Sequence, residues 1–211
     1  MKTHIKPHVS CLKRISDLTI STVILLLTWP LFIVIALLIK LTSKGPVIYC
    51  QRRVGQILPE RTKFFIMYKF RTMTNKAESG TGAVWAVEND PRLTILGKVL
   101  RKTRLDELPQ LFNVLRGDMS LIGPRPERPE IAIKLENQIP YYLERTYGVL
   151  PGITGLAQVY QGYDASIDDV KSKILYDFAY SMSLTKVAKW IKMDCIIIFR
   201  TIWIMILGRG R

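Results

Sequence analysis

The most prominent apolar stretch of the chain runs from Leu18 to Ile39 and follows a basic lead-in over residues 1–17. At about 22 residues it is long enough to cross a bilayer, for which about 20 apolar residues suffice. It is too long for a cleavable signal peptide, and no cleavage site of small residues follows it. Pro30, near its middle, removes one helical hydrogen bond and therefore predicts a sharp bend in the helix.

Positive charges flank this stretch on both sides. They are Lys13, Arg14, Lys40, Lys44, Arg52 and Arg53. Because positive charges close to a membrane segment tend to stay in the cytoplasm, they favour a helix that enters the membrane, breaks at Pro30 and returns to the same side. A straight transmembrane span is the alternative, and the residues alone leave both readings open.

The rest of the chain alternates short strand-like and helical patterns. Strands are predicted at Pro46–Gln51 and Lys63–Lys69, with a turn near Gly55 and Pro59, and a glycine-punctuated turn leads into a strand within residues 150–159. Helices are predicted at Thr94–Thr103, at Ile131–Arg145 with an interruption near Pro140, and at Asp168–Ser181. These elements predict an α+β, mostly helical protein with a small β element, divided into a membrane segment over residues 1–40 and a second domain over residues 41–211.

The last apolar run, Cys195–Leu207, is too short to span a bilayer and contains Arg200. Three lysines on one helical face precede it: Lys186, Lys189 and Lys192. This pattern predicts an amphipathic helix over residues 185–207 that lies at the membrane interface with its lysines on anionic lipid head groups. A buried core helix is the alternative.

Two adjacent carboxylates, Asp106 and Glu107, follow a dense basic cluster. Apolar residues then follow at positions i, i+3, i+4 and i+7, the spacing of one buried helical face. They are Leu108, Leu111, Phe112 and Leu115. Since proline is tolerated in the first helical turn, Pro109 places the start of this helix close to Asp106. Both carboxylates would then lie at a helix N-terminus, which favours their ionised form, and would point about 100° apart, so that they cannot do the same job. An acidic turn that merely suits the helix dipole is the alternative.

The composition narrows the range of partners. The 211-residue chain has a formal net charge of +14, a pI near 9.8 and a mean hydropathy of +0.15. A protein so basic and so apolar is typical of a membrane surface or a phosphate-rich ligand, with nucleic acid as the competing explanation of the charge. Its three widely spaced cysteines indicate reduced thiols, and both histidines, His4 and His8, lie in the N-terminal tail, which argues against a histidine-based active site.

Four cations are candidates for binding phosphate: Lys69, Arg71, Arg101 and Arg125. Arg125 stands between two prolines, whose rigid backbone lowers the entropic cost of fixing it on a phosphate. With no histidine or cysteine nucleophile at hand, a carboxylate can itself attack phosphorus and form an aspartyl-phosphate. Attack by an anion on a diphosphate needs cationic clamps and usually Mg²⁺. The membrane segment implies that one substrate is a lipid.

Four segments carry a resemblance to a known family. They are YKFRTM, NDPR-x-T-x-x-G-x-x-L-R, KTRLDELPQLFNVLRGDMSLIGPRPE and PGITGLAQV. With these motifs the chain, from about Lys13 to its C-terminus, resembles the bacterial sugar transferases of the monotopic phosphoglycosyltransferase class, which prime exopolysaccharide, capsule, O-antigen or glycoprotein glycan synthesis. The LDELPQL…GPRP block is long and hard to meet by chance, so the resemblance is specific.

The resemblance implies an enzyme that transfers a sugar-1-phosphate from a UDP-sugar to undecaprenyl phosphate in two steps and releases UMP. Asp106 matches the family nucleophile, which attacks the β-phosphorus and forms a covalent phosphosugar intermediate, and Glu107 matches its dyad partner. Further positions that match phosphate contacts are Lys69, Arg101 and Arg125. Mg²⁺ would bind near Asp106.

The resemblance also implies a re-entrant membrane helix, broken at Pro30, with both ends in the cytoplasm. The catalytic domain, residues 41–211, is then expected on the cytoplasmic face of the bacterial inner membrane. Larger relatives carry several spanning helices and an extra domain ahead of this unit, and the present sequence resembles the minimal catalytic form.

The sequence departs from the family pattern at three named positions and in one longer segment. Trp29 stands where serine often precedes the proline, and Leu156 stands where tryptophan is common. Arg104 replaces a frequent serine and adds a further candidate phosphate contact. The link from Ser183 to Asp194 is longer than usual. None of these departures touches the Asp106–Glu107 pair.

Two other functions compete with this interpretation. One is a membrane-tethered basic module for nucleic acid or anionic lipid, which would require clustered aromatics between the cations, and only Phe70 stands in that setting; we therefore expect no nucleic-acid partner. The other is an inverting glycosyltransferase, which would release UDP. The identity of the sugar stays open, with the loops Asn75–Gly82 and Gln161–Asp169 as candidate selectors, and so does the formation of a homodimer.

Overall fold

The computed structural model describes residues 5–75, 77, 90–161 and 167–207, and the loops at Asn75–Gly82 and Gln161–Asp169 lie largely outside these ranges. The described elements, in chain order, are α1 (Pro7–Thr42), β1 (Ile48–Leu58), β2 (Arg61–Phe70), α2 (Ile95–Lys102), the 3-10 turn η1 (Leu105–Glu107), α3 (Gln110–Arg116), β3 (Ser120–Ile122), α4 (Pro129–Gln138), the 3-10 turn η2 (Leu143–Thr146), β4 (Gly152–Thr154), α5 (Leu156–Tyr160), α6 (Ile167–Ser183) and α7 (Val187–Ile206). Helices with two small two-stranded sheets confirm the α+β, mostly helical class.

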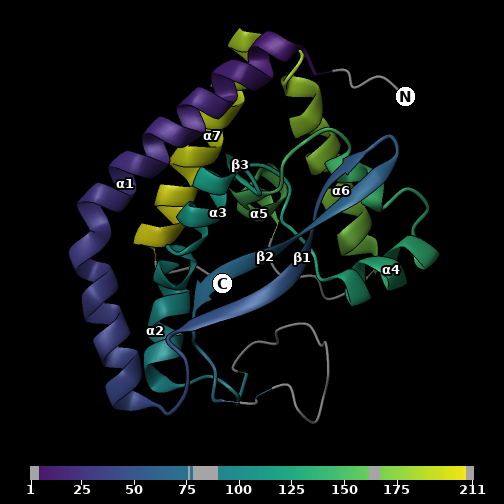
Figure 1. Cartoon of the computed structure of the whole chain (residues 1–211). Helices are drawn as coiled ribbons and strands as arrows, with labels where there is room; N and C mark the ends of the chain where they lie inside the picture. Colours follow the sequence, from purple (N-terminus) through teal and green to yellow (C-terminus); the bar gives the residue numbers. More distant parts are fainter. Residues whose placement is uncertain (1–4, 76, 78–89, 162–166, 208–211) are drawn as a thin grey trace.

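The N-terminal helix α1 is 36 residues long and runs through Pro30 without interruption. Figure 1 shows it along one edge of the molecule, bent between its two halves. Pro30 offers no N–H to the preceding turn, and the hydroxyl of Thr28 donates to the carbonyl of Ile24 at 2.7 Å, a contact that often accompanies a bend. The predicted break at Pro30 is therefore a bend within one continuous helix.

The first half of α1 is tied to the body of the protein by buried charges. Lys13 Nζ lies 3.2 Å from Asp194 Oδ2 on α7. Asp17 Oδ1 accepts a hydrogen bond of 3.1 Å from the backbone N–H of Leu121 in β3. The Asp194 carboxylate also accepts from the indole of Trp190 at 2.6 Å. Lys13, which the sequence analysis counted among the positive flanks of the apolar stretch, is thus part of a largely buried network that joins α1 to α7.

Arg14, the second predicted flank charge, closes the end of another helix. Its guanidinium donates to the carbonyls of Val114 and Leu115 at 2.6 and 2.9 Å. These are among the last carbonyls of α3, which have no partner within the helix. The C-terminus of α3 is completed by Gly117, whose φ of 86° is the left-handed conformation common at this position.

The second half of α1 packs on the strands and on α2. Ile35 and Ile39 are buried against Phe70, at the end of β2, and Leu100 in α2. Arg71 closes this end of α1, because its guanidinium donates to the carbonyls of Ser43 and Lys44 at 2.8 and 2.9 Å and to the Ser43 hydroxyl at 2.7 Å.

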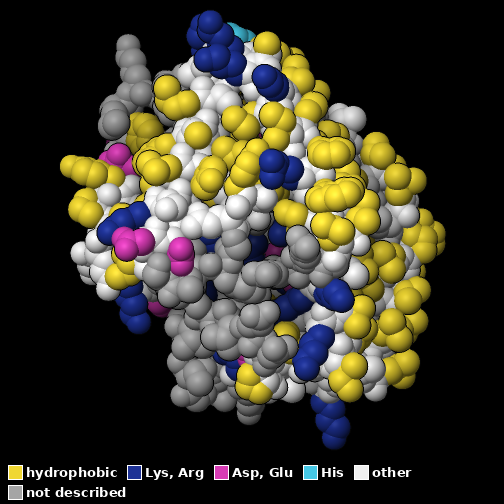
Figure 2. All heavy atoms as spheres, turned by 180° about the vertical axis from the view of Figure 1, so that it is seen from behind, with side chains coloured by type: hydrophobic (Ala, Val, Ile, Leu, Met, Phe, Trp, Pro, Cys, Tyr) yellow, Lys and Arg dark blue, Asp and Glu magenta, His cyan; other side chains and the backbone are white. Residues whose placement is uncertain are grey.

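Between these attachments α1 exposes an apolar surface. Large side chains at least half exposed on it are Leu26, Leu27, Trp29, Ile33, Val34, Leu37 and Leu41. In the described part of the chain α1 is the one helix long and apolar enough to cross a membrane, and 11% of its most apolar window is buried. Exposed apolar side chains also gather on α7, and Figure 2 shows yellow side chains over the face that these two helices form.

The strands β1 and β2 form an antiparallel hairpin with Ile48 opposite Phe70 and Leu58 opposite Arg61. Both strands are longer than predicted, and the turn comes at residues 59–60. Gly55 lies inside β1, where the register shifts between Val54 and Ile57, as at a β-bulge. The hairpin runs through the middle of the molecule, between the side occupied by α1, α2 and α3 and the side occupied by α4 and α6 (Figure 1).

Two elements after the hairpin differ from the sequence prediction. The α-helix predicted to begin near Asp106 begins at Gln110, because the carboxylates lie on the 3-10 turn η1 and Pro109 is the N-cap of α3. Phe112, predicted to be buried, is 47% exposed and faces α1. The strand predicted within residues 150–159 is present as the short β4, but it ends at Thr154 and the chain continues as α5.

The remaining predictions agree better with the structure. The helix over Thr94–Thr103 is confirmed as α2, the interruption near Pro140 separates α4 from η2, and α6 matches the predicted Asp168–Ser181. The last helix, α7, begins at Val187 and takes up most of the predicted link. Leu156, the departure from the family pattern, is buried in the core that joins β3, α5, α6 and α7.

Gly97 sets the distance between α2 and the segment after β2. A Cβ at this position would lie 1.9 Å from the carbonyl oxygen of Thr72. We expect Gly97→Ala to destabilise the protein by about 1–3 kcal/mol or more, because backbone atoms cannot move aside as a flexible side chain can. Thermal unfolding in detergent measures this as a fall in Tm of about 2–4 °C per kcal/mol. The neighbouring exposed variant Lys98→Ala is the control, and equal Tm values for the two variants would contradict the expectation.

Candidate active site

Asp106 and Glu107 lie on the turn η1 between α2 and α3. The turn is entered through Arg104, which has a φ of 56° although it is not glycine. A left-handed residue reverses the chain sharply after α2, and Leu105 and Leu108 then pack on the second half of α1. Both carboxylates face inward, with relative exposures of 6% and 7%.

Lys69, at the end of β2, joins the two carboxylates. Its Nζ donates to Glu107 Oε1 at 2.7 Å and lies 3.9 Å from Asp106 Oδ2. Arg125 contacts the same Glu107 oxygen, with Nη1 at 3.4 Å. Two sequence-predicted cations, one from β2 and one from the loop after β3, thus converge on Glu107 in η1, while Asp106 has the weaker ionic contact.

The two carboxylates have different electrostatic environments. Burial raises the pKa of Asp106 to about 6, since the charges of Lys69 and Arg101 only partly offset the loss of water and the charge of Glu107 adds to it. Burial also acts to raise the pKa of Glu107, but the charges of Lys69, Arg125 and Arg104 outweigh it and hold that pKa below its usual range. Burial lowers the pKa of Lys69 despite both carboxylates.

The other predicted cations have separate positions. Arg101, on α2, donates through Nε to the Thr72 hydroxyl at 3.1 Å, and its charge acts on Asp106. The positive charge of Arg104 likewise lowers the pKa of Glu107. Arg71 does not join this group in its described contacts, because its terminal nitrogens are engaged at the end of α1. The contacts of Arg71 therefore indicate a structural role.

The donor set can be tested against a magnesium ion. The described residues contain no group of three or more histidine, cysteine, aspartate or glutamate side chains that could hold a metal. Mg²⁺ is usually held by one or two carboxylates together with substrate phosphates and water, and it does not require an all-protein cage. Asp106, which has the weaker cationic contact of the two, fits such a ligand.

Arg53 and Glu127, which the sequence analysis did not assign to the site, hold the loop that carries Arg125. Arg53 Nη1 donates to Pro126 O at 3.1 Å and lies 3.2 Å from Glu127 Oε1. Burial lowers the pKa of Arg53 to about 10. The negative charge of Glu127 opposes this shift, and the positive charges of Arg125 and Arg128 add to it. Arg53 had been counted as a membrane flank, and a pairing across 74 positions leaves no local signal in the sequence.

A second buried pair supports the same loop from behind. Arg145 Nη1 lies 2.6 Å from Asp177 Oδ2 on α6, and Nη2 donates to the backbone carbonyl of Arg125 at 2.8 Å. Because Arg145 is buried, its position is set by these partners, and it fixes the backbone at Arg125.

Asn113 joins α3 to β2 close to Lys69. Its Oδ1 accepts from the N–H of Tyr68 at 3.0 Å, and its Nδ2 donates to the carbonyl of Ile66 at 2.7 Å. The fully buried amide thus bonds β2 much as a neighbouring strand would. The sequence held one signal of this structural role, a polar residue within the apolar run LFNVL, because a buried amide must find hydrogen-bond partners.

The sequence is similar to those of several known proteins. Residues 8–208 match the sequence model of the family described as bacterial sugar transferase. UDP-N-acetylgalactosamine-undecaprenyl-phosphate N-acetylgalactosaminephosphotransferase of Aeromonas hydrophila is 44% identical over 204 residues, which are 97% of this chain and 46% of that protein. UDP-glucose:undecaprenyl-phosphate glucose-1-phosphate transferase of Xanthomonas campestris pv. campestris is 42% identical over 170 residues, 80% of this chain and 34% of that protein.

A third relative is similar over nearly its whole length. Exopolysaccharide production protein ExoY of Rhizobium meliloti (strain 1021) is 34% identical over 220 residues, which cover 98% of this chain and 90% of that protein. The chain therefore spans less than half of the first two relatives and most of the third. Because the family match covers nearly all of the sequence, the resemblance carried by the LDELPQL…GPRP block is confirmed: the chain belongs to the bacterial sugar transferase family.

Proposed function

We propose that this protein transfers a sugar-1-phosphate from a UDP-sugar to undecaprenyl phosphate and releases UMP. The observation that carries the proposal is the contrast between two adjacent buried carboxylates. Glu107 is neutralised by Lys69 and Arg125, whereas Asp106 keeps a weaker ionic contact and a raised pKa. The names of the two undecaprenyl-phosphate transferases among the relatives support the same reaction class.

The reaction proceeds in two displacements. In the first, an oxygen of the Asp106 carboxylate attacks the β-phosphorus of the UDP-sugar, the bond from that phosphorus to the bridging oxygen breaks, and UMP leaves with both electrons. Asp106 then carries the sugar phosphate as an acyl phosphate. In the second, a phosphate oxygen of undecaprenyl phosphate attacks the same phosphorus and displaces the Asp106 carboxylate. The product is the undecaprenyl diphosphate sugar, and the enzyme returns to its starting state.

The chain supplies charge stabilisation for both steps. Lys69 and Arg125 are preorganised on Glu107 beside the nucleophile, and Arg101 and Arg104 add positive potential. Preorganised cations in a site shielded from water stabilise the charge that develops on transferred phosphoryl oxygens. Asp106 would hold Mg²⁺, which supplies further neutralisation of the diphosphate charge when it is bound.

Glu107 orients this machinery. Its carboxylate receives both Lys69 and Arg125 on one oxygen, so it sets the position of two cations from different elements. With its pKa lowered it stays ionised at neutral pH, which suits the binding of cations and excludes the role of a general acid.

The membrane location follows from α1 and α7. We propose that α1 enters the cytoplasmic leaflet of the bacterial inner membrane and returns to the same face, with the catalytic domain in the cytoplasm. The support is the bend in α1, its exposed apolar middle and the attachment of both halves to one body. The exposed apolar side chains of α7 would lie at the interface, and its lysines would face anionic head groups.

The nucleophile can be tested with a UDP-sugar carrying a radiolabelled β-phosphate, added with Mg²⁺ in detergent. In the absence of acceptor we expect label to stay on the wild-type protein and UMP to be released. In Asp106→Asn the amount of protein-bound label and the rate of UMP release should each fall by at least about a thousandfold, because an amide cannot act as the nucleophile. Glu60→Gln, in the exposed turn between β1 and β2, removes one carboxylate charge away from the site, so it is the matched control and should behave as wild type.

Normal turnover by Asp106→Asn would exclude the covalent mechanism. Release of UDP in place of UMP would indicate an inverting glycosyltransferase, and no nucleotide release with any UDP-sugar would favour the binding-module alternative.

The raised pKa of Asp106 also predicts how stability depends on pH. Folding disfavours the ionised carboxylate, so the stabilising contribution of the protonated form is present below the unfolded pKa of about 3.8 and is lost as the pH rises through about 6. Because an amide cannot ionise, Asp106→Asn should raise Tm relative to wild type, and more at pH 8 than at pH 5. Thermal unfolding of both proteins across this range measures the difference, and a gain that does not depend on pH would contradict the shift.

The topology of α1 can be read by cysteine labelling. In a variant with Cys11, Cys50 and Cys195 changed to serine, single cysteines are introduced as Lys6→Cys and Lys44→Cys, at exposed positions just outside the two ends of α1. We expect a membrane-impermeant maleimide to label both from the cytoplasmic side of inverted vesicles. Labelling from opposite sides would show that α1 spans the membrane.

A further inference from the structure

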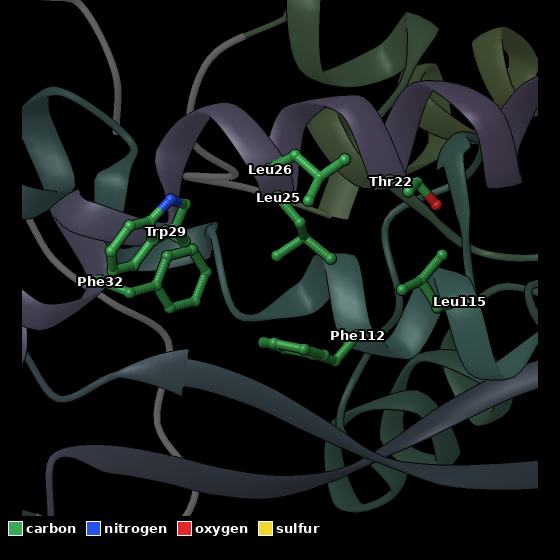
Figure 3. Close-up of a pocket in the computed structure, with 7 residues that line it drawn as sticks. All are labelled: Thr22, Leu25, Leu26, Trp29, Phe32, Phe112 and Leu115. Carbon is green, nitrogen blue, oxygen red and sulfur yellow. The ribbon is translucent and has the colours of Figure 1, made fainter.

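A groove lies between α1 and α3 on the exposed apolar side of the molecule. Its main lining residues are Leu25, Leu26, Trp29 and Phe32 from α1 and Phe112 and Leu115 from α3, and they define the α1–α3 groove. Its volume is about 300 Å³, at the lower end of the range for small-molecule sites. Figure 3 shows Leu25 pointing from α1 toward Phe112 on α3 across this space.

The groove leaves large apolar side chains exposed to water. Leu26 and Trp29 are 69% and 60% exposed, and Phe112 is 47% exposed although its position in α3 predicted burial. Each Å² of apolar surface left in water costs about 25 cal/mol. A contiguous concave surface of this kind is typical of a site for an apolar ligand.

The groove lies close to the candidate active site, because Phe32 belongs to the same apolar cluster as Leu105 and Leu108, which flank the carboxylates. The ring of Phe32 lies 5.3 Å from that of Phe70 and 6.0 Å from that of Phe112, between centroids. Phe70 directly follows Lys69, whose ammonium contacts Glu107. Phe112 comes five residues after Glu107, roughly 8 Å along the chain at the rise of an α-helix. One end of the groove therefore lies within a short distance of the buried carboxylates.

Cations at one end and an apolar groove at the other complement an amphiphile with a phosphate head. We propose that the α1–α3 groove binds the isoprene units of the polyprenyl phosphate acceptor that lie nearest its phosphate, which rests on the proposed function. Branched, unsaturated isoprene units suit the aromatic rings of Trp29, Phe32 and Phe112. The phosphate of the same molecule reaches the site of Lys69 and Arg125. An acyl chain of a bilayer lipid is the competing occupant, and it has no requirement for this position beside the carboxylates.

The two half-reactions can be measured separately, so the groove can be tested independently of the proposed function. Leu25→Trp fills the groove with a larger side chain, and Leu27→Trp places the same side chain on the outer surface of α1, where Leu27 is 75% exposed and does not line the groove. The burst of UMP without acceptor measures the first half-reaction. Transfer to undecaprenyl phosphate and to farnesyl phosphate measures the second.

We expect a normal UMP burst in both variants. The KM for either acceptor should rise at least about tenfold in Leu25→Trp and stay unchanged in Leu27→Trp. A similar rise with farnesyl phosphate is expected because the groove has room for only the first isoprene units. An unchanged acceptor KM in Leu25→Trp would overturn the proposal and would favour a bilayer acyl chain as the occupant.

A second variant covers the case in which Leu25→Trp does not fold. Phe112→Ala opens the groove, so it should raise the acceptor KM while the UMP burst persists, and a normal acceptor KM in this variant would also overturn the proposal. Absence of a UMP burst in the wild-type protein with every UDP-sugar would instead contradict the proposed function itself.

Discussion

The ion pair between Lys69 and Glu107 is the contact around which the site is built, because it joins the end of a strand to a turn 38 positions later. Glu107 is buried and Lys69 is largely buried, so removing either would leave the other with only its longer ionic contact in a site shielded from water. The pair constrains β2, η1 and, through Arg125, the loop after β3 to a single relative arrangement. Asp106 has the weaker cationic contacts, so the two neighbouring carboxylates have pKa values shifted in opposite directions.

The apolar helix α1 is part of this arrangement and not only a candidate membrane anchor. Its first half is joined to α7 and β3 through Lys13 and Asp17, and Arg14 closes the end of α3. Its second half packs on Leu105 and Leu108, which flank the carboxylates. A site built directly on α1 places the proposed nucleophile, Asp106, close to the surface where the proposed lipid acceptor would arrive.

Local patterns predicted elements well where one residue decides the outcome. The helix predicted over Thr94–Thr103 is present as α2, which Thr94 caps through a 2.9 Å bond from Gly97 N, and the helical segment is interrupted near Pro140, as expected. The bend predicted at Pro30 is present, but the predicted break is not, because a helix can bend at proline and continue when the next turns are well supported. Phe112 was placed in the core because helical spacing identifies an apolar face without saying whether protein or lipid covers it.

The sequence by itself determined the family, the α+β class, the apolar helix and the candidate pair Asp106–Glu107, since these depend on composition, spacing and a long contiguous motif. Only the tertiary structure decided which carboxylate is neutralised and which cations surround it. Lys69 reaches Glu107, whereas Arg71 turns to the end of α1, although the two stand two positions apart in one motif. The physical reason is that charge stabilisation depends on distance and burial, and both are set by contacts between segments far apart in the chain.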